Sequence, residues 1–138
     1  MKRLITFIFL FSAIRSLSQS HLPVSQIDFV RIKDAGKAEA LYFYENNWKV
    51  YREVALKKGY IKSYNLLTAK ADSLADFDIM LVTEYADSTQ FKNSEAHFQQ
   101  IIKELRPGGP KLLNELKPAD FRINLYSKVA NSMFYGSL

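Results

Sequence analysis

EALYFYENNWKVYREVALKKGYIKSY, residues 39–64, is the stretch of sequence that decides the fold. Apolar and aromatic residues recur in it at steps of three and four, which is the spacing of one face of an α-helix. Gly59 follows two lysines and favours a helix end at that point. The pattern therefore predicts a helix over residues 37–58 and a strand over residues 61–69. The residues on the periodic face are Leu41, Tyr44, Trp48, Tyr51 and Ala55.

Strand and helix patterns flank this stretch on both sides. Residues 26–33, 77–85 and 121–128 each have the apolar alternation of a strand. Asp87 stands where a helix N-cap belongs, and helical spacing then continues to Leu105, before RPGGP at 106–110 ends it. A further helix over residues 111–116 is an open alternative. The order β-α-β-β-α-β predicts an α+β, ferredoxin-like sandwich with both helices on one face of an antiparallel sheet.

This order of elements, together with the aromatic first helix quoted above, resembles the dimeric α/β-barrel superfamily. That superfamily includes small monooxygenases, haem-degrading enzymes and NIPSNAP-like proteins. The likeness lies in Trp48 and in the basic–glycine exit into the second strand. It implies a homodimer in which two sheets face each other to close a barrel, with a cleft between each sheet and its helices. The haem-degrading relatives place an asparagine on the first strand, where this chain has Asp28 and Arg31, so haem chemistry is not carried over.

The first eighteen residues have the three parts of a secretory signal peptide. Lys2 and Arg3 are followed by an almost unbroken apolar run over residues 4–14, and Ser16 and Ser18 suit the small-residue positions before a cut. The apolar run is too short to cross a membrane, which takes about twenty residues. We therefore expect residues 1–18 to be removed, residues 19–25 to form a flexible lead, and residues 26–138 to form one exported domain, periplasmic or secreted.

Export changes the charge of the working protein. The chain carries 19 basic and 14 acidic residues, a net charge of +5. Lys2, Arg3 and Arg15 leave with the signal, so the mature net charge is +2. That asymmetry is too small to indicate a nucleic-acid partner, which demands a clustered basic face. The sequence contains no cysteine. Once the signal peptide is removed, we expect no membrane attachment.

Strong catalytic and metal motifs are absent from the sequence. It contains no Gly-rich phosphate loop, no HExxH and no GxSxG, so neither a metal site nor a cofactor is predicted. His97, on the second helix, is the candidate catalytic residue, as a general base. The alternative is an ordinary histidine at the boundary of the core.

The first helix offers a candidate ligand site. Glu45, Trp48 and Arg52 form one stripe at steps of three and four, and Tyr44 and Tyr51 flank it. Two charged groups beside an aromatic face could orient a ligand in the cleft between sheet and helices. The alternative is that Glu45 and Arg52 fringe the core with their charged heads in water.

Two further patterns concern the faces of these elements. A second apolar stripe of the first helix, formed by Phe43, Val50 and Val54, predicts cover by a partner or by the chain's own tail. In the third and fourth strands, alternation predicts one plain core face and one mixed face. The core faces are Phe77, Ile79 and Leu81, and Phe121, Ile123 and Leu125; the mixed faces are Asp78, Met80, Val82 and Glu84, and Arg122, Asn124, Tyr126 and Lys128.

Three functions remain open from the sequence. The first is an exported domain that binds a small, partly apolar molecule in the sheet–helix cleft. The second is a cofactor-free monooxygenase or isomerase, with His97 as its base. The third is a non-catalytic interaction protein that uses the stripe of Phe43, Val50 and Val54.

Overall fold

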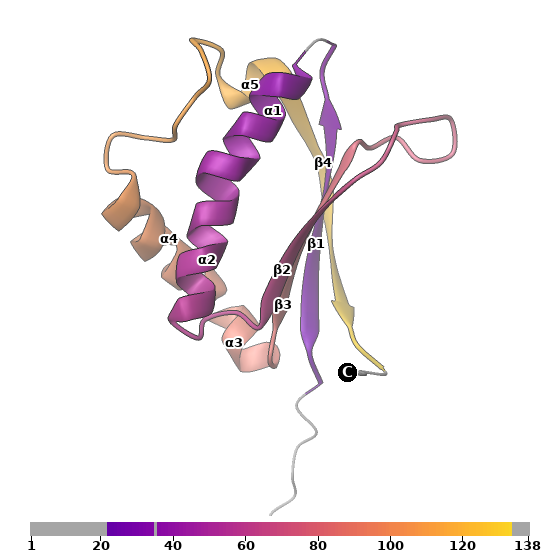
Figure 1. Ribbon diagram of the computed structural model, residues 1–138. Helices are drawn as coiled ribbons and strands as arrows, with labels where there is room; N and C mark the ends of the chain where they lie inside the picture. Colours follow the sequence, from indigo (N-terminus) through magenta and orange to yellow (C-terminus); the bar gives the residue numbers. More distant parts are fainter. Residues whose placement is uncertain (1–21, 35, 134–138) are drawn as a thin grey trace, which may run out of the picture.

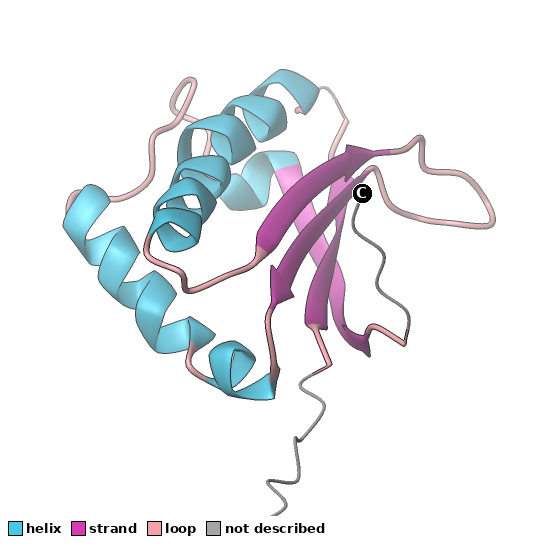
Figure 2. Cartoon of the chain, turned by 60° about the horizontal axis from the view of Figure 1, so that its bottom comes forward, coloured by secondary structure: helices cyan, strands magenta, loops and turns pink. Residues whose placement is uncertain are grey.

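The computed structural model describes residues 22–34 and 36–133 of the chain. Its sheet has four antiparallel strands in the order β2-β3-β1-β4, and the helices lie on one face of that sheet (Figures 1 and 2). This is the ferredoxin-like α+β arrangement that the sequence predicts. The strands are β1 (Val24–Ile32), β2 (Ser63–Thr68), β3 (Ile79–Tyr85) and β4 (Arg122–Asn131). The helices are α1 (Lys37–Phe43), η1 (Tyr44–Trp48), α2 (Lys49–Lys57), α3 (Ser88–Lys92), α4 (Ser94–Leu105) and α5 (Pro118–Phe121).

The central strand β1 pairs with β3 on one side and with β4 on the other. It begins at Val24, inside the segment predicted as a flexible lead, and Val24 is buried in the core. The alternation predicted for β3 is confirmed, because Ile79 and Leu81 are buried on the helix side, while Met80 and Val82 are only partly buried on the other face. The predicted signal peptide, residues 1–18, lies outside the described residues.

The face assignment predicted for β4 is wrong. Arg122 and Asn124 pair with Ile32 and Val30 on the helix side, whereas Ile123 pairs with Arg31 on the outer face. The register then shifts between Phe29 and Val30, with Phe29 opposite Tyr126 and Val30 opposite Asn124. Leu125 is therefore an extra residue, a β-bulge, and the chain beyond it presents Ser127 to the helix side, opposite Asp28.

The long first helix is continuous over Lys37–Lys57 but has a π-helical turn at its centre, η1. Asn47 lies on the inner side of this turn and is completely buried, although the helical pattern favours the polar side for it. Its amide donates to the carbonyls of Phe43 and Lys111 and accepts from the Lys111 N–H. These three bonds tie the centre of the helix to the loop after α4.

The stripe of Phe43, Val50 and Val54 was predicted to be covered by a partner or by the chain's own tail, but other parts of the described chain pack against Phe43 and Val54. Phe43 packs against Phe121, with ring centroids 5.9 Å apart, and the Arg122 guanidinium lies 4.6 Å from its centroid. Val54 packs into the core cluster that α4 closes. Helix α4 and the start of β4 thus cover this side from within the chain. Leu41, predicted to be buried, is instead 36% exposed.

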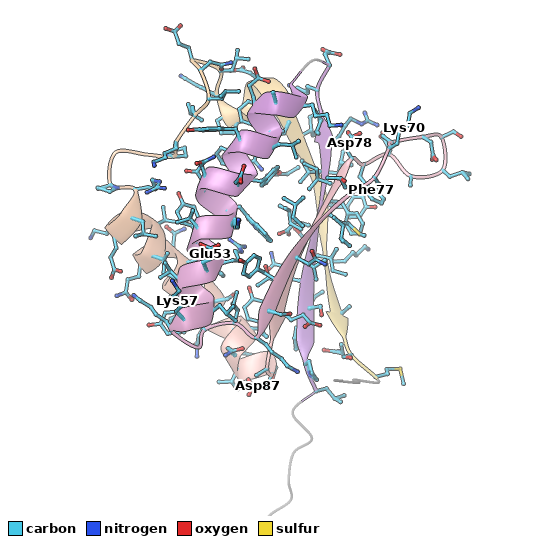
Figure 3. The ribbon with its side chains drawn as sticks, in the orientation of Figure 1. Glu53, Lys57, Lys70, Phe77, Asp78 and Asp87 are labelled. Carbon is cyan, nitrogen blue, oxygen red and sulfur yellow. The ribbon has the colours of Figure 1, made fainter. Side chains whose placement is uncertain are left out.

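The second helix and the loops complete the layer. Asp87 caps α3 through a bond from the Gln90 N–H, as predicted, and α4 follows after Asn93. Residues 111–116 are not helical; the short helix α5 forms just after them instead. The loop from β2 to β3 extends from the end of the sheet that is remote from Asp87 (Figure 3). Among the described helices, none is long and apolar enough to cross a membrane.

Candidate functional site

A cavity of about 310 Å³ lies between the sheet and the helices. Figure 3 shows side chains filling the layer between the sheet and the helices. Ligand pockets have volumes of roughly 300–1,000 Å³, so this cavity suits a small ligand. Its lining comes from every strand but β2 and from both long helices: Asp28, Phe43, Tyr44, Trp48, Tyr51, Arg52, Leu81, Ile102, Arg122, Asn124, Tyr126 and Ser127.

The helix side of the cavity is aromatic. Tyr44 and Trp48 begin and end the π-helical turn, and Asn47 between them fixes that turn to the loop at Lys111. Both rings are buried, and Trp48 makes an edge contact with Tyr64 on β2. The Trp48 Nε1–H is buried and has no hydrogen-bond partner among the described residues. A buried donor without a partner costs free energy.

Arg52 supplies a buried positive charge from α2. Its guanidinium lies between two rings, 4.7 Å from the Trp48 centroid and 4.1 Å from that of Phe98, and its Nε donates to Thr83 Oγ1 at 3.4 Å. Burial lowers the pKa of Arg52 to about 10, while the charges of Tyr85 and Asp28 act in the opposite direction. Since the guanidinium is buried among rings, the expectation that its head lies in water is wrong.

Arg122 supplies a second positive charge from the start of β4. Its Nη1 donates to Tyr44 Oη at 2.7 Å and to Asn124 Oδ1 at 2.9 Å. Its Nε is buried and has no partner among the described residues. Burial raises the pKa of Tyr44, while the charge of Arg122 and its hydrogen bond act in the opposite direction. Tyr44 therefore stays a neutral phenol that accepts from Arg122.

Asp28 is the carboxylate of the cavity lining. It lies at the middle of β1, and its Oδ1 accepts from Ser127 Oγ at 2.5 Å and from Gln26 Nε2 at 3.1 Å. The other oxygen, Oδ2, has no hydrogen-bond partner in the described part of the chain. The two bonds to Oδ1 hold the Asp28 side chain in place. Its Oδ2 can therefore accept a hydrogen bond from a ligand.

The structure brings together four of the five predicted ligand-binding residues, since Tyr44, Trp48, Tyr51 and Arg52 all line the cavity. Glu45 does not line it, but is exposed on the other side of Trp48, in a second pocket of about 360 Å³ that β2 also lines.

His97 also lies away from the cavity. Its imidazole stacks on Tyr60, with ring centroids 3.7 Å apart and an interplanar angle of 11°. Its Nδ1 is buried without a partner among the described residues. The geometry therefore places His97 against the Tyr60 ring and not beside the cavity-lining groups.

The sheet side of the cavity was not found from the sequence. Asp28, Arg122, Asn124 and Ser127 all come from β1 and β4. One signal was available, because Asp28 stands among apolar residues of the first strand on the face that also carries Val24 and Val30. No group of metal-ligating side chains occurs among the residues with described placement.

Fold and cavity together define a class: a small ferredoxin-like α+β domain with a ligand-sized cavity between its sheet and its helices. The sequence matches no family model, and no curated protein is similar to it.

Solved structures share the fold. HapK from Hahella chejuensis superposes with a TM-score of 0.53 at 12% identity, over 83% of this chain and 97% of that one. An uncharacterised NIPSNAP-like domain protein from Burkholderia xenovorans superposes with a TM-score of 0.51 at 11% identity, over 86% and 91%. The predicted ferredoxin-like fold, and its likeness to that of a NIPSNAP-like domain, are therefore confirmed. At these identities the likeness concerns the fold alone.

Proposed function

We propose that the protein binds a small, partly apolar molecule in the cavity between its sheet and its helices. The observation that carries this proposal is the lining itself, in which an aromatic wall faces two arginines. No described carboxylate forms an ion pair with Arg52 or Arg122. Both arginines are partly buried, and a charge that is partly removed from water without a counter-charge is costly. A bound molecule with acceptor groups would offset that cost.

A ligand screen tests the proposal directly. Purified protein is mixed with a library of small aromatic and alicyclic compounds, and its melting temperature is recorded. A true ligand raises the melting temperature, because it binds the folded state alone. The shift should disappear in Trp48→Leu and persist in Lys92→Ser, an exposed residue outside the cavity lining. A library without any binder would reject the proposal.

The outer face of the sheet supports a homodimer. Its centre is apolar and only partly buried, with Ile27 opposite Val82 and Phe29 opposite Met80, and the helices do not cover it (Figure 2). Three large apolar side chains on this face are exposed further out: Leu67, Ile123 and Tyr126. A second copy placed face to face would remove this surface from water.

Mass in solution across a dilution series tests the dimer. We expect a stable dimer that Val82→Lys converts to monomers, since a charge at the centre of an apolar interface is left unpaired. Glu53→Lys, on the helix layer (Figure 3), is the matched control and should remain dimeric. A monomeric wild-type protein would reject the homodimer.

Export is the third part of the proposal. It rests on the basic start, the apolar run and the two serines of residues 1–18. Mass spectrometry of the protein recovered from expressing cells should find a chain that begins at or close to Gln19, outside the cytoplasm. An intact Met1 terminus in the cytoplasm would contradict it.

Proton transfer to or from the bound molecule is the second candidate function, and the Asp28 carboxylate in the cavity favours it. A base of this kind takes a proton from a carbon next to a carbonyl group and returns it. With a ligand from the screen, nuclear magnetic resonance in deuterated water should show loss of that carbon's proton signal, and Asp28→Asn should stop the loss. No exchange with the wild-type protein would leave binding as the function.

A further inference from the structure

We infer that the ligand of this cavity is a small aromatic carboxylic acid, bound as its anion by Arg122. The inference rests on the proposed binding function and deepens it by naming the class of ligand. Three features carry it: the unengaged edge of the Arg122 guanidinium, the net charge of the lining, and the rings beside both.

The first feature is the geometry of Arg122. Both of its hydrogen bonds use Nη1, one to Tyr44 and one to Asn124. The edge formed by Nε and Nη2 has no partner in the described chain, and Nε is buried. Two parallel N–H groups on one edge match the two oxygens of a carboxylate. Because Tyr44 and Asn124 hold the guanidinium from the other edge, the fork is already oriented.

Arg52 does not offer the same edge. Its Nε is engaged with Thr83, and its guanidinium lies between the rings of Trp48 and Phe98. Its charge also interacts with that of Asp28. Arg122 is therefore the arginine of the lining whose side-on edge is open to a ligand carboxylate.

The second feature is the charge of the lining as a whole. Arg52 and Arg122 against Asp28 leave one net positive charge. A carboxylate carries one negative charge and completes this balance. A phosphate ester would bring a second negative charge into a cavity that already contains Asp28, and like charges at short range repel strongly. The lining thus favours a monoanion.

The third feature is the surface beside the fork. The Arg122 guanidinium lies 4.6 Å from the Phe43 centroid and 5.2 Å from that of Tyr44, and Trp48 continues the aromatic wall. Flat rings stack well against such a wall. The unpartnered Trp48 Nε1–H and the free oxygen of Asp28 would additionally recognise a polar substituent on the ligand ring.

Matched pairs of acid and amide test the inference. 2-Naphthoate and 2-naphthamide have nearly the same shape, but only the first is charged; benzoate and benzamide form a smaller pair. Isothermal titration of the wild-type protein should find each acid bound about tenfold or more tightly than its amide, as for hydrogen bonds to a charged group. Trp48 is the sole tryptophan of the chain and lines both this cavity and the pocket at Glu45. A shift of the single indole N–H resonance therefore reports binding beside Trp48, and the Arg122 variants assign it to this cavity.

Variants assign the preference to Arg122. Arg122→Gln should remove the difference between acid and amide, and Arg122→Lys, which keeps the charge but not the fork, should retain part of it. Arg31→Gln is the matched control, because Arg31 is on the outer face of the sheet and pairs with Asp76. Asp28→Asn should tighten binding of the acids, since it removes a repelling charge.

The outcomes separate the inference from the function beneath it. Equal binding of acid and amide overturns the inference and leaves small-molecule binding standing. A preference that survives in Arg122→Gln overturns the role of Arg122. If neither pair binds while another compound of the screen does, the ligand class is wrong. If nothing binds at all, both the inference and the proposed function fail.

Discussion

Strands β3 and β4 lie on either side of β1 and present very different groups to the same helices. From β3, Ile79, Leu81 and Tyr85 are all buried. From β4, Arg122, Asn124 and Ser127 face the same layer and form polar contacts there. One half of the sandwich is thus closed by apolar contact, and the other half contains the cavity.

This difference shows that the apolar and the polar inward side chains are separated across the sheet. A strand whose inward residues are apolar contributes by removing them from water. A strand with charged inward residues contributes less, because each polar group must find a partner. The polar side of this domain is at β4, an edge strand, where a ligand can replace partners that the chain does not supply.

The largest expected effect is a loss of stability on removing a buried side chain of β3. Ile79→Ala removes a completely buried side chain and should lower the free energy of unfolding by about 2–5 kcal/mol. Asn124→Ala, its counterpart on β4, removes an exposed residue that bonds only Arg122 Nη1 and should cost about 0.5 kcal/mol. Urea denaturation measures both values. Similar costs at the two positions would show that β4 contributes to stability as β3 does.

The second effect concerns the start of β4. A Cβ added at Gly36 would lie 2.6 Å from Phe121 Cβ and 2.9 Å from its Cα, so Gly36→Ala must displace the chain where β4 begins. We expect a loss of about 1–3 kcal/mol, as for other overpacked sites. Gly108→Ala is the control, because nothing lies within 4 Å of its added Cβ. Thermal unfolding compares the two variants, and equal melting temperatures would mean that this junction yields easily.

The fold was predictable because its signals are local and repeated. The spacing of Tyr44, Trp48, Tyr51 and Ala55 set the first helix, and the alternation in β3 set its faces. The helix side of the cavity followed from the same spacing. These patterns predict the folded state because the apolar residues that recur at every helical turn, or at every second position of a strand, are the ones that the fold buries.

The sheet side of the cavity could not be predicted for two physical reasons. The strand β4 begins with its polar residues inward, since Phe121 belongs to α5 and is buried there, and the bulge at Leu125 shifts the later residues by one. A shift of one residue exchanges the two faces of a strand. Asn47 was missed because its burial depends on Lys111, which is 64 positions away along the chain.

The third effect tests the π-helical turn that carries the aromatic wall. Asn47→Ala leaves the Lys111 backbone groups and the Phe43 carbonyl without the amide that now bonds them, and should cost about 1–3 kcal/mol. Asn46→Ala removes a side chain with one bond, to the Tyr42 carbonyl, and should change stability by about 0.5 kcal/mol. Differential scanning calorimetry of both variants decides. A neutral Asn47→Ala would mean that the turn holds without its side-chain bonds.

The smallest expected effect is a change of stability at alkaline pH. It compares Tyr85, in the apolar half of the sandwich, with Tyr44, in the half that contains the cavity. Burial raises the pKa values of Tyr85 and Tyr44 above the ordinary 10.0. Between the unfolded and folded pKa values, the unfolded chain has lost protons that the folded chain keeps. Stability is therefore full below about pH 10 and falls as the pH rises toward the folded values. Arg52 acts in the opposite sense, because burial lowers its pKa to about 10, below the ordinary value of an arginine.

Tyr85→Phe and Tyr44→Phe separate these contributions. Each variant removes one tyrosine titration, so its unfolding midpoint in urea should decline less between pH 9 and pH 11 than that of the wild type. For Tyr85→Phe, in the apolar half, we expect this smaller decline of the unfolding midpoint. For Tyr44 a loss at neutral pH accompanies it, because the phenol accepts from Arg122. An unchanged slope in Tyr85→Phe would show that burial in the closed half does not suppress ionisation, and that the two halves are equally open to water.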